Sequence, residues 1–223
     1  AGAAETKPAA AGLNIAIITT PSGVDDGSFN QDNYNGILAF VKNHPTAKAT
    51  AIREPSGDVA AALKAAADVV AEYDVLVCTG FQFAGIGELA MENPDTKFIL
   101  VDTYPTDAKG NTVELPNVYA MTFAEQESGF FAGVAAALET KTNKVAVVNG
   151  VAYPTNVNYQ YGFETGVIYA NKKLGTNVQI VELPSRAGTD VTGANVGGNY
   201  AGSFADEATG KVIGQQLFAQ GVD

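Results

Sequence analysis

Histidine and cysteine each occur only once in the 223-residue chain, and this excludes several kinds of catalytic and metal site. The single histidine, His44, stands beside a proline in KNHPT, where a surface turn is expected. Neither a histidine-based triad nor a metal site with several histidines is therefore possible. The single cysteine, Cys78, cannot form an internal disulfide, and its apolar surroundings in DVLVCTG favour a buried, inert thiol over a reactive one.

Lysine and arginine are scarce, with 13 against 24 aspartates and glutamates, so the formal net charge is -11 and the sequence pI is about 4.4. Nucleic acid is excluded as a partner, because binding to phosphates needs clustered cations. A strong net charge of one sign keeps molecules apart through repulsion, and we therefore expect a monomer.

Long apolar runs and phosphate-binding motifs are missing as well. No stretch approaches the roughly 20 apolar residues of a membrane span. Neither G-x-x-x-x-G-K-[ST] nor G-x-S-x-G occurs, and GIG at 85–87 lacks the third glycine of a dinucleotide site. No cofactor, no metal and no catalytic residue are therefore predicted. The first stretch, AGAAETKPAAAG (1–12), is predicted to be a flexible tether left by removal of a signal or by cloning.

Strand and helix patterns alternate from residue 13 onward. Strands are predicted at 13–20, 48–54, 74–80, 96–102 and 117–123, and helices at 33–44, 58–73 and 83–93. Short runs that are apolar throughout are typical of parallel strands covered by helices on both faces. Residues 13–123 are therefore predicted to form a first α/β lobe.

The same pattern begins again in the second half of the chain. A helix with small residues at packing positions is predicted at 125–140, followed by a strand at 143–150 and an aromatic loop at 151–163. A helix (163–174), a strand (177–184) and a last helix (206–221) complete the chain. A further strand is expected after Asp223, so residues 124–223 are predicted to form a crossing helix and a truncated second lobe. The fold class is α/β, with two doubly wound parallel-sheet lobes.

Polar and aromatic residues gather where the predicted strands end, which is where ligands bind in open α/β sheets. The segment GVDDGSFNQDNYNGI (23–37) follows the first strand, GFQF (80–83) follows the third, and an aspartate ends the fourth. The candidates in the first lobe are Asp25, Asp26, Phe29, Asn30, Phe81 and Asp102. The candidates in the second lobe are Asn156, Asn158, Tyr159, Tyr161, Tyr200, Phe204 and Asp206.

Each candidate also has a purely structural interpretation. Asp26 beside Gly27 is equally consistent with a turn, and Asn30 with a helix cap. The ring of Phe29 could anchor the start of a helix in the core. Phe204 and Asp206 together fit a staple and cap for the last helix.

The mixture of rings, carboxylates and amides indicates a class of ligand. Aromatic faces stack on flat heterocycles, with about 1–3 kcal/mol per base, and carboxylates accept strong hydrogen bonds from hydroxyl and N–H groups. Asparagine both donates to and accepts from a base edge. Because this rim lacks arginine and lysine, phosphates and free carboxylates are disfavoured, and a nucleoside fits better than a nucleotide or an amino acid.

Several stretches resemble the basic membrane protein (Bmp) family, the substrate-binding lipoproteins of ABC importers that include the purine nucleoside receptors. DDGSFNQDNYNGI is similar to the D-x-S-F-N-Q segment of that family. The likeness continues through DVLVCTGFQFAGIGELAMENPDTKFILVD, FAEQESGFFAGVAAALETKTNKVAVVNG, YQYGFETGVIYAN and YAGSFADEATGKVIGQQLFAQGVD. It covers nearly all of residues 13–223.

The resemblance implies a type I periplasmic-binding-protein fold, in which two hinged lobes close over a ligand. It also implies that the base is held between Phe29 and Phe204, that Asn30 and Asp102 hydrogen-bond to it, and that Asp26 lies nearby. The carboxylate and lysine with which the family binds ribose lie beyond Asp223.

The expected function is therefore capture of a purine nucleoside outside the cytoplasm, by a protein anchored through an N-terminal lipid, for delivery to an ABC permease in the membrane. Lobe closure, without bond chemistry, is the expected mechanism. A sensor of the same fold that signals to a membrane partner is the first alternative. A nucleoside-acting enzyme is the second, although the dense aspartate cluster of a calcium-dependent hydrolase is not apparent.

Overall fold

The computed structural model describes residues 12–223, which divide into two compact units. The first unit ends at Thr122 and the second runs over Phe123–Asp223. The tether predicted at 1–12 lies outside the described residues, except for Gly12.

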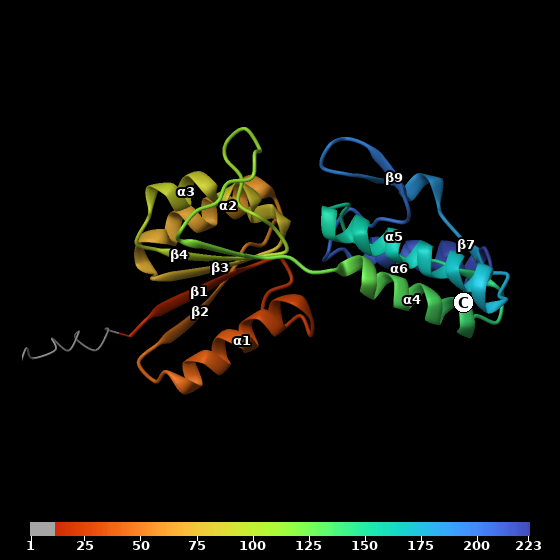
Figure 1. Cartoon of the computed structure of the whole chain (residues 1–223), viewed down its shortest axis with the longest axis horizontal. Helices are drawn as coiled ribbons and strands as arrows, with labels where there is room; N and C mark the ends of the chain where they lie inside the picture. The colour runs from red at the N-terminus through yellow and green to blue at the C-terminus, as the bar shows by residue number, and fades with distance from the viewer. Residues whose placement is uncertain (1–11) are drawn as a thin grey trace, which may run out of the picture. The chain divides into compact units, whose positions relative to one another are not determined.

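A parallel sheet of five strands, in the order β2-β1-β3-β4-β5, forms the centre of the first unit. Its strands are β1 (Asn14–Thr19), β2 (Lys48–Arg53), β3 (Val75–Thr79), β4 (Lys97–Val101) and β5 (Val118–Met121). The helices are α1 (Phe29–Asn43), α2 (Val59–Val69), the 3-10 helix η2 (Phe81–Ile86) and α3 (Gly87–Glu92). Figure 1 shows α1 on one face of the sheet and α2 and α3 on the other. Every strand predicted in this half is confirmed.

Alternate residues of each strand build the two cores of the first unit. Ile17 of β1 belongs to the cluster that includes Ile37 of α1, whereas its neighbour Ile18 packs in the cluster with Ala62 of α2. Cys78 lies in the α2 cluster and is fully buried, and burial raises the pKa of its thiol. The predicted buried thiol is thus confirmed.

The second unit contains short strands between longer helices. Its elements are α4 (Glu125–Glu139), β6 (Lys144–Val145), α5 (Pro154–Tyr169) with a π-helical continuation (Ala170–Leu174), β7 (Gln179–Ile180), the 3-10 helix η4 (Pro184–Arg186), β8 (Gly188–Thr189), β9 (Asn195–Gly197) and α6 (Glu207–Ala219). Strands β6 and β7 pair in parallel, and β8 and β9 pair antiparallel. An isolated parallel bridge also joins Asn149, after β6, to Tyr200, after β9.

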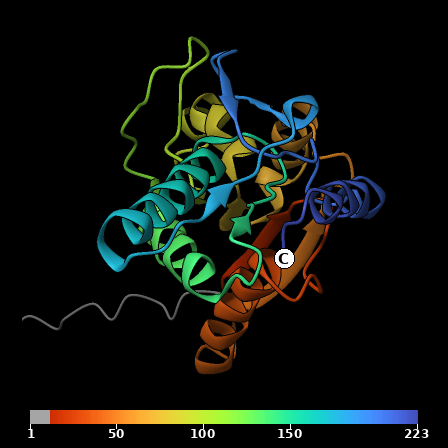
Figure 2. The same cartoon turned by 90° about the vertical axis from the view of Figure 1, so that its right-hand side faces the viewer.

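Helices cover both faces of the β6–β7 layer, as in a doubly wound fold. Phe163 and Val167 of α5 pack in one cluster with Val145 of β6. Ile213 and Leu217 of α6 pack in a separate cluster that contains Val181 and Leu183, next to β7. Figure 2 views this unit from its end, with α5 in teal and α6 in blue on opposite sides. The predicted α/β fold is confirmed.

The start of α5 differs from the sequence prediction. An aromatic loop was expected over 151–163, but the helix begins at Pro154, where the fixed φ and missing N–H of proline suit a first helical position. The four candidates expected on this loop therefore lie on a helix, where they do not follow a strand end. They are Asn156, Asn158, Tyr159 and Tyr161.

Four glycines bring α4 and α5 into backbone contact. Gly129 and Gly133 of α4 face α5, and Gly162 and Gly166 of α5 face α4. A methyl group at Gly133 would overlap the carbonyl oxygen of Phe163, and the other three positions are equally closed by backbone oxygens. The helix packing predicted from small residues at 125–140 is confirmed, and any side chain at these four positions must push the helices apart.

We expect Gly133→Ala to destabilise the second unit by about 1–3 kcal/mol, since the added methyl group meets rigid backbone. Chemical denaturation followed by far-ultraviolet circular dichroism measures this change. Gly214→Ala on α6 is the matched control, because nothing lies within 4 Å of its added Cβ. That control should gain up to about 1 kcal/mol from helix propensity. Equal effects of the two substitutions would contradict the close-packing account.

Candidate functional site

Asp26 organises the loop between β1 and α1. Its Oδ1 accepts hydrogen bonds from the backbone N–H groups of Ser28 and Gln31, each at 3.0 Å, and its Oδ2 accepts from the N–H of Asn30 at 3.0 Å. Partial burial raises the pKa of Asp26, but these bonds outweigh that effect and hold the pKa below its ordinary value. Because Asp26 satisfies the first N–H groups of the helix, α1 begins at Phe29 rather than at the predicted residue 33.

Asn30 is 1% exposed, and its amide joins three segments. Its Oδ1 accepts from the N–H of Thr20 at 3.2 Å and from Oγ1 of Thr79 at 3.1 Å. Its Nδ2 donates to Oγ1 of Thr20 at 2.7 Å and to Oδ2 of Asp26 at 2.8 Å. All four hydrogen-bonding positions of the amide are thus used within the chain. In this arrangement Asn30 connects the ends of β1 and β3 to the start of α1. The hydrogen bond between Asn30 and a base stays a prediction.

Phe29, Phe81 and Asp102 complete the predicted site of the first unit. Phe29 is half-buried and packs against the α1-side core. Phe81 starts η2 directly after β3, and Asp102 follows β4 with a φ of 68°, a left-handed value that is uncommon outside glycine. Phe81 and Asp102 lie at the same edge of the sheet, since Thr79, two residues before Phe81, and Val101, directly before Asp102, are partners in the β3–β4 register.

Phe204 is the predicted aromatic residue of the second unit. Its ring is 47% exposed and lies against Gly150, where any side chain would overlap ring atoms. The ring centroid is 6.1 Å from that of Tyr153, with the planes tilted by 38°. An exposed ring supported from behind by glycine backbone presents a flat apolar face, which suits stacking.

Asn199 positions the segment that leads to this ring. It is 1% exposed, and its Oδ1 accepts from the N–H of Leu183 at 2.8 Å. Its Nδ2 donates to the carbonyl oxygens of Val147 at 3.0 Å and of Val181 at 3.1 Å. The amide therefore connects the chain after β6 to the chain after β7, and holds residues 199–202 between them.

A polar pocket of about 310 Å³ opens at these strand ends. It is lined by the loop after β6, by η4 and β8, and by residues 200–202. Arg186 is the charged residue among those that line it, and Ser185 and Thr189 add hydroxyl groups. The prediction that the rim lacks arginine and lysine is therefore wrong in the second unit. The sequence did contain a sign of this arginine, because Ser185 and Arg186 directly follow the predicted strand NVQIVELP, at a strand end where ligands are expected.

A chain of side-chain hydrogen bonds begins at Tyr200, which lines this pocket. Oη of Tyr200 donates to Oε1 of Gln160 at 2.6 Å, and Nε2 of Gln160 donates to Oε1 of Glu164 at 2.7 Å. Burial, with the nearby Tyr161 and Glu164, raises the pKa of Tyr200 to about 12, so its hydroxyl stays protonated. Burial also raises the pKa of Glu164, against the effect of Gln160, and the neighbouring Glu182 adds to the rise.

Of two further candidates, Asp206 has a structural role and Asp25 is exposed. Asp206 is the N-cap of α6, with its Oδ1 accepting from the N–H of Thr209 at 2.9 Å, which matches the cap interpretation. Asp25 is exposed in the β1–α1 loop.

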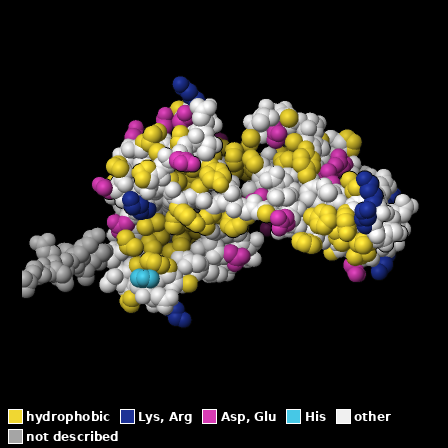
Figure 3. Space-filling model, viewed as in Figure 1, with side chains coloured by type: hydrophobic (Ala, Val, Ile, Leu, Met, Phe, Trp, Pro, Cys, Tyr) yellow, Lys and Arg dark blue, Asp and Glu magenta, His cyan; other side chains and the backbone are white. Residues whose placement is uncertain are grey.

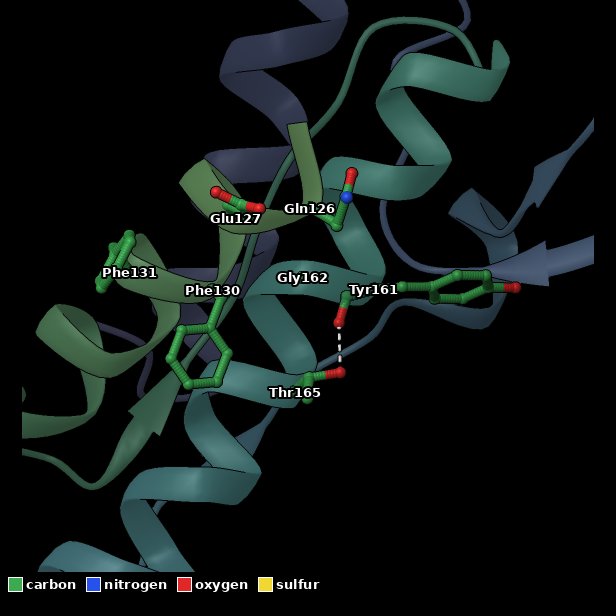
Figure 4. Close-up of a pocket in the computed structure, with 7 residues that line it drawn as sticks. All are labelled: Gln126, Glu127, Phe130, Phe131, Tyr161, Gly162 and Thr165. Atoms are coloured by element: carbon green, nitrogen blue, oxygen red, sulfur yellow. Dashed lines mark hydrogen bonds between the residues drawn. The ribbon is translucent and has the colours of Figure 1, made fainter. Parts of the chain in front are cut away.

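A second hollow, of about 400 Å³, lies between α4 and α5. Figure 4 shows the ring of Phe130 between the two helices and the ring of Tyr161 pointing away from α4. The hydroxyl of Thr165 donates to the carbonyl oxygen of Tyr161 at 2.6 Å, and is thus already used. Apolar side chains are exposed over α4 (Figure 3), among them Phe131. This groove offers few donors or acceptors for a base or a sugar.

Neither a metal centre nor a membrane span is found in the part of the chain that the structure describes. Between residues 12 and 223, no three histidine, cysteine, aspartate or glutamate side chains are grouped so that they could hold an ion. None of the helices in that range has the length and apolar character of a bilayer span.

Comparison with known proteins establishes the family. The profile of the Bmp family, described as ABC transporter substrate-binding protein PnrA-like, matches residues 14–189. The chain belongs to the Bmp family. The resemblance seen in the sequence is confirmed, and this family consists of substrate-binding proteins of ABC transporters.

Named relatives share the matched region. The Bmp-family chain is 30% identical over 220 residues to the ABC transporter nucleoside-binding protein BmpA of Lactococcus lactis, covering 95% of this chain and 53% of that protein. It is 28% identical over 230 residues to a Pyrococcus abyssi protein named as a lipoprotein, covering 99% of this chain and 50% of the relative. The chain thus spans about half the length of the curated relatives it matches.

A solved structure supports the fold of this Bmp-family chain. A solute-binding protein of an ABC transporter system from Aeropyrum pernix K1 aligns with a TM-score of 0.74 and 24% identity, covering 94% of this chain and 53% of that one. The predicted periplasmic-binding-protein fold is confirmed. Members of the family are extracytoplasmic, membrane-associated lipoproteins, in agreement with the coarse expectation for location.

Asn30→Ala should destabilise the first unit by about 1–3 kcal/mol, because the buried Thr79 and the partly buried Thr20 lose their hydrogen bonds to this amide. Urea denaturation measures the loss. Asn43→Ala is the control, since the Asn43 amide makes one exposed bond, of 3.2 Å, to the carbonyl oxygen of Ala39. A loss for Asn30→Ala no larger than that of the control would refute the bracing role.

The raised pKa of Glu164 gives a pH dependence with a defined sign. Because the folded state holds this proton more tightly than the unfolded state, ionisation of Glu164 costs stability at pH values above its folded pKa. Glu164→Gln should therefore be more stable than the parent protein at neutral pH. The difference should shrink as the pH falls toward 4.5, the ordinary pKa of glutamate, and vanish below it. Thermal unfolding across pH 4 to 8 tests this, and a difference that grows on acidification would contradict it.

Proposed function

We propose that this chain belongs to an extracytoplasmic receptor that captures purine nucleosides for an ABC importer. The observation that carries the proposal is the exposed ring of Phe204, which rests on the backbone of Gly150 beside a polar pocket at the strand ends. A flat apolar face next to hydrogen-bonding groups suits a heterocyclic base with a sugar attached. The name of the Lactococcus lactis relative, which is a nucleoside-binding protein, supports the same ligand class.

Residues of the first unit are part of the proposal as predicted ligand contacts. Phe29 offers a partly exposed ring, and Phe81 and Asp102 lie at the ends of neighbouring strands. Asp102 keeps a left-handed backbone conformation at the end of β4, and such conformations gather at binding sites. Asp26 and Asn30 hold the loop that carries Phe29, and we propose that they contribute chiefly through this positioning.

The proposed mechanism is binding without chemical conversion of the ligand. Closure of a hinged receptor is driven by the higher affinity of its closed state for the ligand, and the ligand is then passed to a membrane permease. An N-terminal lipid would keep the receptor at the membrane, and a monomer would suffice for capture.

Isothermal titration calorimetry of the full-length protein with adenosine, guanosine, inosine, ribose and amino acids tests the ligand class. Nucleosides should bind, whereas ribose alone should bind far more weakly because it lacks a ring to stack. Binding of only a sugar or an amino acid would overturn the nucleoside assignment. Release of free ribose from inosine would instead reveal an enzyme.

Phe204→Ala should weaken nucleoside binding by about 5- to 150-fold, which corresponds to the loss of one stacked base contact. The fold should persist, because this ring is exposed and lies on a loop. Phe218→Ala is the matched control, since Phe218 is also an exposed ring, at 67%, but stands on α6. If both variants bind nucleosides like the parent protein, Phe204 is not a ligand contact.

A further inference from the structure

Arg186 lines the polar pocket, and its guanidinium has N–H groups that donate no hydrogen bond within residues 12–223. It ends η4, is half-buried, and lines the pocket together with Ser185 and Tyr200. Its guanidinium makes no hydrogen bond or salt bridge with any group in residues 12–223. The hydroxyl of Tyr200 does not compete for a ligand, because it donates to Gln160. The planar fork of Arg186 is therefore the strongest donor that the pocket offers, and it suits two adjacent acceptors.

The charges around the pocket argue against an anionic ligand. Hydrogen bonds from Thr209 lower the pKa of Asp206, and the positive charge of Arg186 lowers it further, so an ionised carboxylate lies within electrostatic reach of the guanidinium. Glu164 and Glu182 both lie close enough to Tyr200 to raise its pKa. A phosphate in this pocket would be repelled by nearby carboxylates as well as attracted by Arg186. A neutral group with two acceptors gains the hydrogen bonds of Arg186 without that repulsion.

The pocket adjoins the ring of Phe204. Gly150, on which the ring rests, immediately precedes the lining residue Val151, and the lining residue Gly202 stands two positions before Phe204. A base stacked on this ring would therefore lie next to the pocket that Arg186 lines. On a 6-oxopurine, O6 and N7 are adjacent acceptors that match an arginine fork. Adenine presents N7 beside an amino group, which is a donor and cannot accept a hydrogen bond from the guanidinium.

Building on the proposed nucleoside-receptor function, we propose that Arg186 determines base specificity by donating two hydrogen bonds to O6 and N7 of a 6-oxopurine. Guanosine and inosine, which share this edge, then bind in preference to adenosine. The 2-amino group that distinguishes guanosine from inosine has no part in this selection.

Competition calorimetry on the full-length protein provides the first test. Guanosine and inosine should both bind at least about ten-fold more tightly than adenosine, as expected for a bidentate arginine contact. 7-Deazaguanosine, which lacks the N7 acceptor, should bind more weakly than guanosine. This comparison changes only the ligand, so it holds even where a variant fails to fold.

Arg186→Met is the test on the protein, since it keeps an unbranched stem and removes the donors. It should reduce the preference for guanosine over adenosine to within about three-fold, and it should bind guanosine and 7-deazaguanosine equally. Arg186→Lys keeps the charge without the fork and should regain only part of the preference. Thermal unfolding checks that both variants are folded.

The outcomes separate this inference from the proposed function. If no nucleoside binds the parent protein, the receptor proposal itself fails. If nucleosides bind but adenosine equals guanosine, or if the preference survives Arg186→Met, the role of Arg186 is refuted and the receptor proposal stands. Guanosine monophosphate that binds more tightly than guanosine, with an advantage lost in Arg186→Met, would show that Arg186 binds a phosphate.

Discussion

A buried asparagine amide holds the strand ends together in each unit, and the candidate ligand residues depend on it. Asn30 joins β1 and β3 to the first turn of α1, and Asn199 joins the chain after β6 to the chain after β7. Parallel strands end with unpaired peptide groups where the sheet stops. A fully satisfied amide supplies both donors and acceptors for these groups at little cost, whereas a half-satisfied one would be expensive to bury.

These two amides explain how loops rich in glycine keep a defined shape. The segment before Phe29 is fixed by Asp26 and Asn30, and the segment before Phe204 is fixed by Asn199. Neither ring needs a deep apolar socket, because its backbone is already positioned. The rings can therefore remain partly exposed, as the two proposed ligand contacts require.

The sequence predicted the architecture well where the pattern of apolar residues decides the structure. The strands of the first unit and the buried Cys78 both follow from the local pattern of apolar residues. The starts of α1 and α5 were wrong, because each depends on contacts outside the apolar pattern. Asp26 extends α1 backward, and glycine packing against α4 accompanies the early start of α5.

The candidate site was harder to predict because polar residues of one type have different roles. Among the asparagines, Asn30 and Asn199 are buried braces, whereas Asn156 and Asn158 lie on a helix. A sequence shows neither how many hydrogen bonds a side-chain amide makes within the fold nor whether an arginine side chain has a hydrogen-bond acceptor there.

The same limitation hid Arg186, and its position changes the chemistry expected of the ligand. Aromatic rings with carboxylates alone favour a ligand rich in hydroxyl and N–H donors. An arginine whose guanidinium makes no hydrogen bond within residues 12–223 adds a demand for acceptors, and the nearby carboxylates limit how much negative charge those acceptors can carry. A neutral base that bears adjacent oxygen and nitrogen acceptors meets both demands, while its sugar hydroxyls can still donate to carboxylates. In the proposed role of Arg186, the pairing of one cation with several acids would select for a polar but uncharged ligand, which agrees with an acidic protein that has few cations to hold an anion.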